Sequence, residues 1–234
     1  MNKSDSEMLS LAILNNVAWC KCVASSSKVA SDETEELWWA EHPMPPYFPN
    51  LVTKDLTANE KLVLNTMCSL SPYFVKDSFN ALHLDDKGFE KLFEAQWYAC
   101  DFVLEQSCEA SEAEDFSLHK IACAEQLVEW EKAWQGDFQS LVYPPSIVDN
   151  PAVEFHLCRH GDLSAGLTLF VTDASIGIYN LWGTDELIAR LLSQVSRSIP
   201  QLPIVGYGDK EELSMLAKLG FCSLSKLAVW GKFS

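Results

Sequence analysis

Residues 176–221 read IGIYNLWGTDELIARLLSQVSRSIPQLPIVGYGDKEELSMLAKLGF. Apolar runs of strand length alternate here with segments whose apolar residues recur every three or four positions. The predicted elements are a strand, a helix, a short buried strand and a second helix, over residues 176–182, 186–196, 204–207 and 210–219. Gly220 suits the end of the second helix. This alternation is typical of an α/β protein.

The segments on either side extend the pattern. A closing strand is predicted over residues 221–232, and a strand, a helix and two strands precede the quoted stretch, over residues 118–123, 124–134, 153–159 and 165–172. The N-terminal part begins with helical spacing and continues in the order β, β, α, β, α, β, over residues 8–24, 37–40, 51–53, 57–69, 73–79, 85–93 and 96–102. We therefore expect an α/β (α+β) fold with mixed, mostly antiparallel sheets flanked by helices.

An acidic connection separates the two parts. Residues 104–117 (LEQSCEASEAEDFS) contain few large apolar side chains, which is the composition of a solvated segment. A chain of 234 residues is long enough for two small domains. We expect an N-terminal half over residues 1–103, a linker over residues 104–117 and a C-terminal half over residues 118–234.

The two halves show the same order of elements, which indicates an internal duplication. Each contains a strand, a helix opened by threonine, a short strand, a short helix ending in Lys-Leu and a closing strand. A single offset of 127 positions relates four pairs of identical residues: Thr57 and Thr184, Leu64 and Leu191, Lys91 and Lys218, and Leu92 and Leu219.

The charge balance excludes some classes of partner. The chain has 33 acidic and 17 basic side chains, a net charge of −16, and its basic residues are scattered singly. Proteins that bind nucleic acid need clustered Lys and Arg, and an anionic membrane surface needs them too. We expect no nucleic-acid or membrane partner, whereas a small cationic molecule such as an amine would be attracted.

We expect neither a membrane span nor a secretory signal. No stretch reaches the roughly 18 uninterrupted apolar residues of a membrane span, because Asn15 and Asn16 break the apolar start at residues 8–18. Only Lys3 precedes that start among basic residues, which does not suit a secretory signal. The eight cysteines are dispersed rather than grouped as a disulfide framework. We therefore expect a cytoplasmic protein with reduced thiols.

Several short phrases resemble the GNAT acyltransferase superfamily. In the C-terminal half they are the strand at 176–182, the PIVGY strand at 203–207 and the AKLGF phrase at 217–221. The whole chain is further similar to uncharacterised bacterial tandem GNAT-like proteins. The phrases that carry this second similarity are Asn15-Asn16 followed by Trp19-Cys20, Pro45-Pro46 followed by Pro49-Asn50, and VKDSF at 75–79.

The resemblance implies an acyl-CoA cofactor such as acetyl-CoA. GNAT enzymes splay two neighbouring strands to pair with the pantetheine arm, and they seat the pyrophosphate on amides at a helix N-terminus. The positions that would match are Tyr179, Asn180, Leu181, Trp182, Gly183 and Thr184. The family's Arg/Gln-x-x-Gly-x-Gly/Ala loop is absent, and Asp185 and Glu186 follow instead. Their like charge opposes a pyrophosphate at this place.

The catalytic pattern of the family is incomplete here. GNAT enzymes often protonate the departing thiolate with a tyrosine, and the position that would match is Leu216. Tyr207, at the end of the short strand, is the nearest substitute. Structural packing of its ring is the competing interpretation. Glu154 is the candidate base that would take a proton from an amine. The turn at residues 53–57 in the N-terminal half has no glycine, which favours a purely structural half.

Two further patterns have alternative interpretations. His156, Cys158 and His160 alternate along one strand and could ligate a metal, but residues two apart on a strand are separated by about 7 Å, which suits a tetrahedral site poorly. We therefore predict no metal site. Trp38 and Trp39 project to opposite faces of a strand. Burial of both is favoured over a role in binding a ligand or partner.

The N-terminal helix contains residues with the same ambiguity. Asn15 and Asn16 could bridge the halves or line a cleft, although bonding to buried backbone is the simpler role. Cys20 and Cys22 lack the spacing of a redox or zinc pair, so we expect them to pack in the core.

Two functions remain open from the sequence. The first is an acyl-CoA-dependent N-acyltransferase-like protein that acts on a small amine or amino acid. The second is a non-catalytic GNAT-like binding or interaction module, for a protein or a small ligand, that has lost the CoA pyrophosphate loop. The short turn at Gly183 favours the second.

Overall fold

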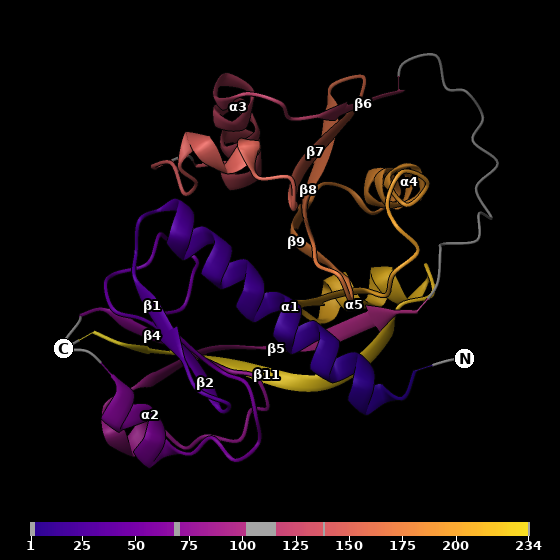
Figure 1. Ribbon diagram of the computed structural model, residues 1–234. Helices are drawn as coiled ribbons and strands as arrows, with labels where there is room; N and C mark the ends of the chain where they lie inside the picture. Colours follow the sequence, from indigo (N-terminus) through magenta and orange to yellow (C-terminus); the bar gives the residue numbers. More distant parts are fainter. Residues whose placement is uncertain (1–2, 68–70, 102–115, 138, 234) are drawn as a thin grey trace.

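A computed structural model describes residues 3–67, 71–101, 116–137 and 139–233 (Figure 1). Their strands form one mixed sheet in the order β1-β2-β3-β4-β11-β5-β10-β9-β8-β7-β6. The strands are β1 (Ser31–Glu33), β2 (Leu37–Ala40), β3 (Leu51–Thr53), β4 (Tyr73–Asp77), β5 (Glu90–Cys100), β6 (Phe116–Lys120), β7 (Val153–His160), β8 (Leu163–Val171), β9 (Ile176–Trp182), β10 (Ile204–Gly208) and β11 (Cys222–Lys232). The α-helices are α1 (Asp5–Ser26), α2 (Glu60–Thr66), α3 (Ala124–Gln135), α4 (Asp185–Val195) and α5 (Lys210–Ala217), with short 3₁₀ helices η1 (Asp85–Lys87) and η2 (Pro145–Asp149). The expected α/β class is confirmed.

The strand order and directions are symmetric about the centre of the sheet. The parallel pair β3 and β4 precedes β11, and the parallel pair β10 and β9 follows β5. The central pair β11 and β5 is antiparallel, and each of these strands is antiparallel to its outer neighbour as well. Outward from the central pair, both sides therefore show the same succession of strand directions, and β6 adds one further strand at one edge.

The closing strands are exchanged between these two arrangements. β11 comes last in the chain but pairs with β4, and β5 comes before the acidic connection but pairs with β10. The expected division at residues 104–117 therefore does not coincide with a division of the sheet. Of that expected linker only Phe116 and Ser117 are described, and they begin β6. The residues before them lie outside the described part of the chain.

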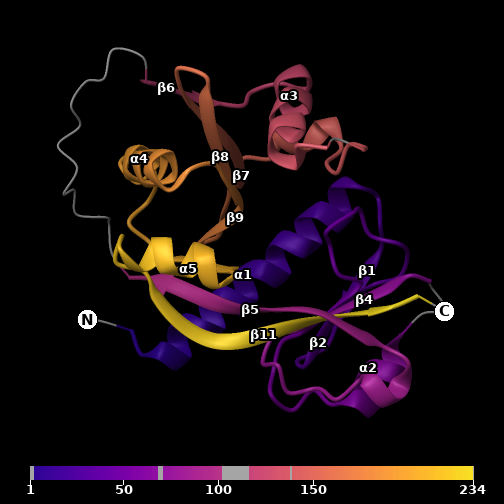
Figure 2. The ribbon, with the colours of Figure 1, turned by 180° about the vertical axis from the view of Figure 1, so that it is seen from behind.

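Helices cover both faces of the sheet. α1 packs on the face that carries Ala95, Trp97 and Val205. α4 and α5 pack on the opposite face, with Tyr98 and Ile204. Figure 1 shows α1 running diagonally across the sheet, and Figure 2 shows α5 in front of α1 when the molecule is seen from behind. These two faces matter for the site, because side chains reach it from both.

α1 is a core helix by its packing. Ser4 caps it, and the Glu7 side chain accepts a hydrogen bond from the backbone N–H of Ser4, which completes a capping box. The helix is long and apolar enough to cross a membrane by length and composition alone. Its residues Met8, Ala12 and Ile13 are nevertheless buried against β5, β10 and β11. This burial accounts for the apolar composition without a membrane.

Three local predictions are wrong. The expected helix over residues 85–93 is only η1, and β5 already begins at Glu90, because its first residues pair with β11. Lys91 and Leu92 therefore lie in a strand. Lys218 and Leu219, which the 127-residue offset matches to them, instead follow the end of α5. The third concerns the start of α2, where the side chain of Asn59, not of the expected Thr57, accepts from a backbone N–H.

Candidate functional site

The parallel strands β9 and β10 separate soon after they meet. They pair only at Ile204 with Ile176 and at Val205 with Gly177, although β9 continues to Trp182 and β10 to Gly208. Beyond Gly177, the backbone of β9 pairs with no described strand on this side. A gap in the sheet therefore opens between the two strands.

A bulge in β9 explains the separation. Its pairing with β8 shifts between Gly166 and Thr168, so that two residues of β9 face one residue of β8. Asn180 lies at this bulge with φ of 50°, a left-handed conformation that asparagine tolerates. Its Oδ1 accepts hydrogen bonds from Tyr143 (2.7 Å) and Thr168 (3.1 Å), which hold the bulge in place. Bulges bend a strand, and this one turns β9 away from β10.

The gap opens into a cavity of about 400 Å³, which we call the central cavity. Its walls come from α1, β4, β5, β9, β10, the start of α5 and the proline-rich loop before β3. They are formed by Asn16, Trp19, Cys20, Tyr47, Phe48, Pro49, Lys76, Phe93, Glu94, Ala95, Ile178, Tyr179, Asn180, Leu181, Tyr207, Gly208, Asp209 and Glu212. The size suits a small-molecule ligand.

Tyr207 lies on the wall of the central cavity, as its position in β10 predicted. It is half-buried, and its ring makes an edge-on contact with Trp97 at 5.5 Å between centroids. Tyr179 also lines the cavity, but its hydroxyl donates to Asn15 Oδ1 at 2.8 Å, and its ring stacks on Trp19. Tyr179 is therefore committed to packing against α1, whereas none of the hydrogen bonds found among described residues occupies the Tyr207 hydroxyl.

Glu212 reaches the cavity from the other face of the sheet. Asp209 caps α5 by accepting from the N–H groups of Glu211 and Glu212, and this fixes the first turn beside Gly208. A Cβ at Gly208 would lie 2.6 Å from the Glu212 carboxyl carbon, so glycine makes room for this carboxylate. Burial raises the pKa of Glu212 to about 7, and the charge of Asp209 adds to the rise, while the Tyr98 hydroxyl opposes it.

Tyr207 and Glu212 thus approach the same cavity from opposite faces. Tyr207 shares its face of β10 with Val205, which packs against α1, whereas the Gly208 position faces α5. The central cavity therefore passes through the sheet. Glu212 was not predicted as a site residue, because neither its burial nor its approach to Gly208 can be inferred from a helical pattern.

Glu154 does not belong to the central cavity. It lies on β7, which is separated from β9 by β8. Its Oε2 is 2.9 Å from His156 Nε2, and its Oε1 accepts from Lys120 at 2.6 Å. The hydrogen bond with His156 is the main reason that the pKa of Glu154 falls to about 2. The structure therefore does not bring Glu154 together with Tyr207, and so low a pKa makes it a poor base.

The start of α4 forms a second, open depression, which we call the acidic groove. It lies between α4 and α5 and shares Leu181, Asp209 and Glu212 with the central cavity. Its remaining lining residues are Trp182, Gly183, Asp185, Ile188, Lys210, Glu211, Ser214 and Met215. Four carboxylates against one lysine make this groove unsuited to an anion.

Gly183 and Thr184 have structural roles at this groove. Gly183 has φ of 123°, and a Cβ there would lie 2.3 Å from the Ala165 Cβ, so the close approach to β8 requires glycine. Thr184 is the N-cap of α4 but makes no side-chain cap bond. The first turn carries Asp185 and Glu186. Their charges already complement the helix dipole and would repel a phosphate at this place.

The equivalent gap between β3 and β4 is closed. The Ser78 N–H donates to Thr53 Oγ1 at 2.8 Å, and the Ser78 hydroxyl donates to the Thr53 carbonyl at 2.6 Å. Lys54 is held by Glu33 and by the Thr34 carbonyl. The two bonds between Ser78 and Thr53 join the ends of β3 and β4 beyond their last paired residues, Val52 and Lys76.

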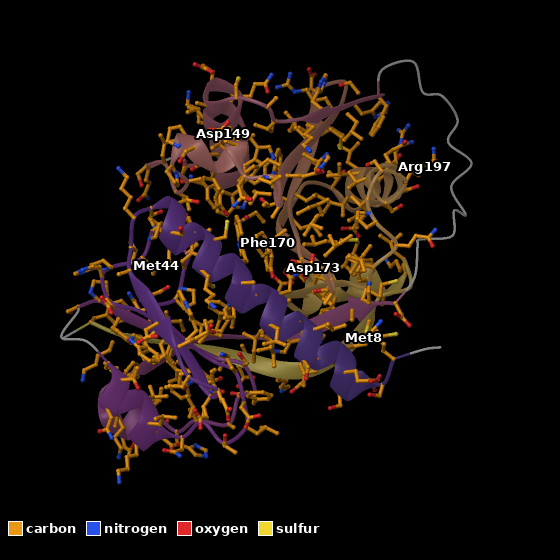
Figure 3. The ribbon with its side chains drawn as sticks, in the orientation of Figure 1. Met8, Met44, Asp149, Phe170, Asp173 and Arg197 are labelled. Carbon is orange, nitrogen blue, oxygen red and sulfur yellow. The ribbon has the colours of Figure 1, made fainter. Side chains whose placement is uncertain are left out.

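Asn15 and Asn16 have different roles, because Asn15 bonds to buried backbone and Asn16 lines a cavity. Asn15 Nδ2 donates to the carbonyls of Phe170 (3.3 Å) and Ser175 (3.2 Å), which ties α1 to the second half. Figure 3 shows Phe170 beside α1. Asn16 instead faces the central cavity, where its Oδ1 accepts a hydrogen bond from Lys76 at 3.1 Å.

Cysteine and metal chemistry have little support at this site. Burial raises the pKa of Cys20 to about 11, so its thiol stays protonated near neutral pH. His156 is buried against Glu154 and the neighbouring strands. Within the described ranges no three His, Cys, Asp or Glu side chains converge as metal ligands.

Comparisons with known proteins give a fold but no sequence relative. No protein-family model matches the chain, and no curated protein matches it either. Solved structures match over nearly the whole chain. One is a GCN5-related N-acetyltransferase from Kribbella flavida, with a TM-score of 0.60, 12% identity, and coverage of 93% of this chain and 95% of that one.

Two further structures show the same similarity. A functionally unknown conserved protein from Staphylococcus epidermidis gives a TM-score of 0.58 at 12% identity, with 87% and 93% of the two chains covered. A putative acetyltransferase of the GNAT family from Novosphingobium aromaticivorans gives 0.57 at 10% identity, with 95% and 97% covered. The chain therefore has the fold of GNAT acetyltransferases along its length, as the short phrases predicted.

Proposed function

We propose that this chain, which has the GNAT fold, is an acyl-CoA-dependent N-acyltransferase-like protein that acts on a small amine or amino acid. The observation that carries the proposal is the central cavity, which opens where β9 and β10 separate and holds Tyr207 and Glu212. A pantetheine arm could pair with the free backbone of β9 beyond Gly177, as an added strand would. The free thiols of Cys20, Cys22, Cys123, Cys158 and Cys222 agree with a cytoplasmic setting, which we include in the proposal.

The two ends of the cofactor fit the chain differently. The gap offers unpaired backbone and a cavity for the acyl and pantetheine part. The N-terminus of α4 does not fit the diphosphate, because Asp185 and Glu186 occupy its first turn. Gly183 does not provide a cradle, since Ala165 fills the space beside it. We therefore assign only the thioester arm to this site.

The residues of the cavity can move the required protons. A bound acyl thioester supplies an activated acyl group for attack by an amine. An amine is protonated near neutral pH, and it must lose a proton before it can attack. Glu212, with its pKa raised to about 7, is suited to accept that proton. The Tyr207 hydroxyl, on the opposite face of the gap, is suited to donate a proton to the leaving sulfur.

A non-catalytic binding module is the second candidate. The acidic first turn of α4 favours it, since acyl-CoA would meet repulsion there. In this case the central cavity would bind a small molecule without acyl transfer.

Ligand-induced stabilisation separates these candidates. We expect both S-acetylpantetheine, which lacks the nucleotide, and acetyl-CoA to raise the Tm of the full-length protein, with the smaller ligand at least as effective. A ligand at 100 times its Kd adds about 2.7 kcal/mol to the free energy of unfolding. Acetylated amines, detected by mass spectrometry after incubation with amino acids and amines, would support transfer. Thermal shifts without product would favour the module, and no shift with either thioester would exclude the acyltransferase.

A further inference from the structure

We propose that Lys76 binds the carboxylate of the acceptor, so that the substrate class is an apolar α-amino acid rather than a simple amine. That this ligand is the acceptor of an acyl group rests on the proposed function. The binding of a carboxylate by Lys76 does not depend on acyl transfer. Nothing in the sequence motifs assigned a role to Lys76.

Lys76 is a buried cation. It lies on β4, within the sheet, and only 4% of its surface is exposed. Its Nζ donates to Asn16 Oδ1 at 3.1 Å and lies 3.8 Å from the centre of the Tyr207 ring. Both partners are neutral.

No carboxylate of the described residues lies within ion-pair distance of Lys76. Within the part of the chain that the structure describes, the ion pairs of Asp and Glu involve other cations, and none involves Lys76. Burying an ammonium group without an opposite charge is costly, and buried charges in proteins are normally paired. An ammonium has three N–H donors, of which Asn16 takes one and the Tyr207 ring faces another. At least one donor remains.

The free donor can reach a ligand, because Lys76 lines the central cavity. It does so on the face of the sheet that carries α1, Asn16 and Tyr207. Glu212 lines the same cavity from the face that carries α5. The other two carboxylates that line it have partners of their own, because Glu94 pairs with Lys91 and Asp209 caps α5. A cation on one side and a carboxylate on the other complement the two charges of an amino acid, with its carboxylate at Lys76 and its amine toward Glu212.

The walls between these charges are largely aromatic. Trp19, Phe48, Phe93 and Tyr179 line the cavity together with Tyr207. Such walls favour an apolar side chain on the ligand. The volume of about 400 Å³ accommodates one amino acid beside a thioester.

Three matched ligands test the inference without any acyl donor. L-phenylalanine carries both charges, 3-phenylpropionate lacks the amine, and 2-phenylethylamine lacks the carboxylate. Binding to the full chain is measured by titration calorimetry and by tryptophan fluorescence, since Trp19 and Trp97 lie near the site. The variants are Lys76→Met, which keeps the length and apolar stem, and Lys76→Arg, which keeps the charge.

We expect Lys76→Met to weaken the binding of both carboxylates about 10- to 100-fold, the loss typical of a charge-assisted hydrogen bond. Binding of 2-phenylethylamine should change little, and Lys76→Arg should retain most of the carboxylate affinity. The Tm of Lys76→Met without ligand should equal or exceed that of the wild type, because an unpaired buried charge is removed. A merely structural lysine would instead lower the Tm.

Two results would overturn the inference. One is unchanged carboxylate binding in a folded Lys76→Met protein. The other is the failure of both carboxylates to bind the wild type at millimolar concentration. Failure of the proposed function looks different: amino acids would bind in a Lys76-dependent manner, but thioesters would neither bind nor react.

Discussion

The Nζ of Lys76 lies 3.8 Å from the centre of the Tyr207 ring, although the two residues belong to strands that are not neighbours. Lys76 lies on β4 and Tyr207 on β10, with β11 and β5 between them. At about 4.8 Å per strand, their backbones are about 14 Å apart, so the side chains meet above the two central strands. The exchanged strands β11 and β5 therefore bring both parts of the chain to one cavity.

Glu212→Gln should abolish the pH dependence of acyl transfer near neutrality. The carboxyl group is protonated below its pKa of about 7 and ionised above it, so activity of the wild type should rise with pH and level off above that value. The variant should lose about 100-fold or more in kcat, as is usual for loss of a general base. Glu211→Gln, on the exposed side of the same helix, is the control. An unaltered pH profile in Glu212→Gln would remove Glu212 from the mechanism.

Tyr207→Phe should lower kcat while leaving ligand affinity and Tm nearly unchanged. Only the hydroxyl is removed, and the ring keeps its contacts with Trp97 and Lys76. We expect a loss of about 100-fold for a proton donor, measured with saturating thioester. A variant with wild-type kcat would show that Tyr207 only packs.

Asp185→Asn combined with Glu186→Gln should strengthen acetyl-CoA binding several-fold. Each charge at the start of α4 contributes about 0.3–1 kcal/mol through the helix dipole, so the same change should slightly lower the free energy of unfolding. Calorimetry with acetyl-CoA and with S-acetylpantetheine measures the effect, which should be confined to the charged ligand. Asp173→Asn, in the exposed β8–β9 turn (Figure 3), controls for net charge. Equal gains in both double and control variants would refute a local repulsion.

Glu154→Gln should reduce stability and leave acyl transfer intact. The pKa of Glu154 is lowered in the folded state to about 2, chiefly by His156, so its ionised form stabilises the fold at neutral pH. This contribution, about 1–3 kcal/mol, should disappear as pH falls from 4.5 toward 2. Urea unfolding of both proteins across that pH range measures it. A loss of transfer at unchanged stability would restore Glu154 as a catalytic candidate.

Much of the C-terminal half could be predicted from local patterns. The strand at Ile176–Trp182 was predicted with the bounds that the structure gives, and β10 and α4 within one residue at their ends. These elements carry clear periodicity, and proline and glycine mark their ends. Because the gap lies between two of them, the place of Tyr207 followed as well.

The features that could not be predicted depend on packing between distant parts of the chain. Residues 90–94 are exposed and show no strand alternation, and only pairing with the distant β11 makes them a strand. Lys76 is buried because α1 and β10 cover it, and Glu212 acquires its pKa from burial beside Gly208. Glu154 has the residue type of a base but lies two strands from the gap. Local sequence does not encode which strands become neighbours.

The most direct test of the account is a crystal structure of the protein soaked with S-acetylpantetheine. We predict ordered density for the ligand between β9 and β10 beside Leu181, with its thioester between Tyr207 and Glu212 and its amides paired to the backbone of β9. An open gap without ligand at saturating concentration, or a ligand bound elsewhere on the molecule, would contradict the account.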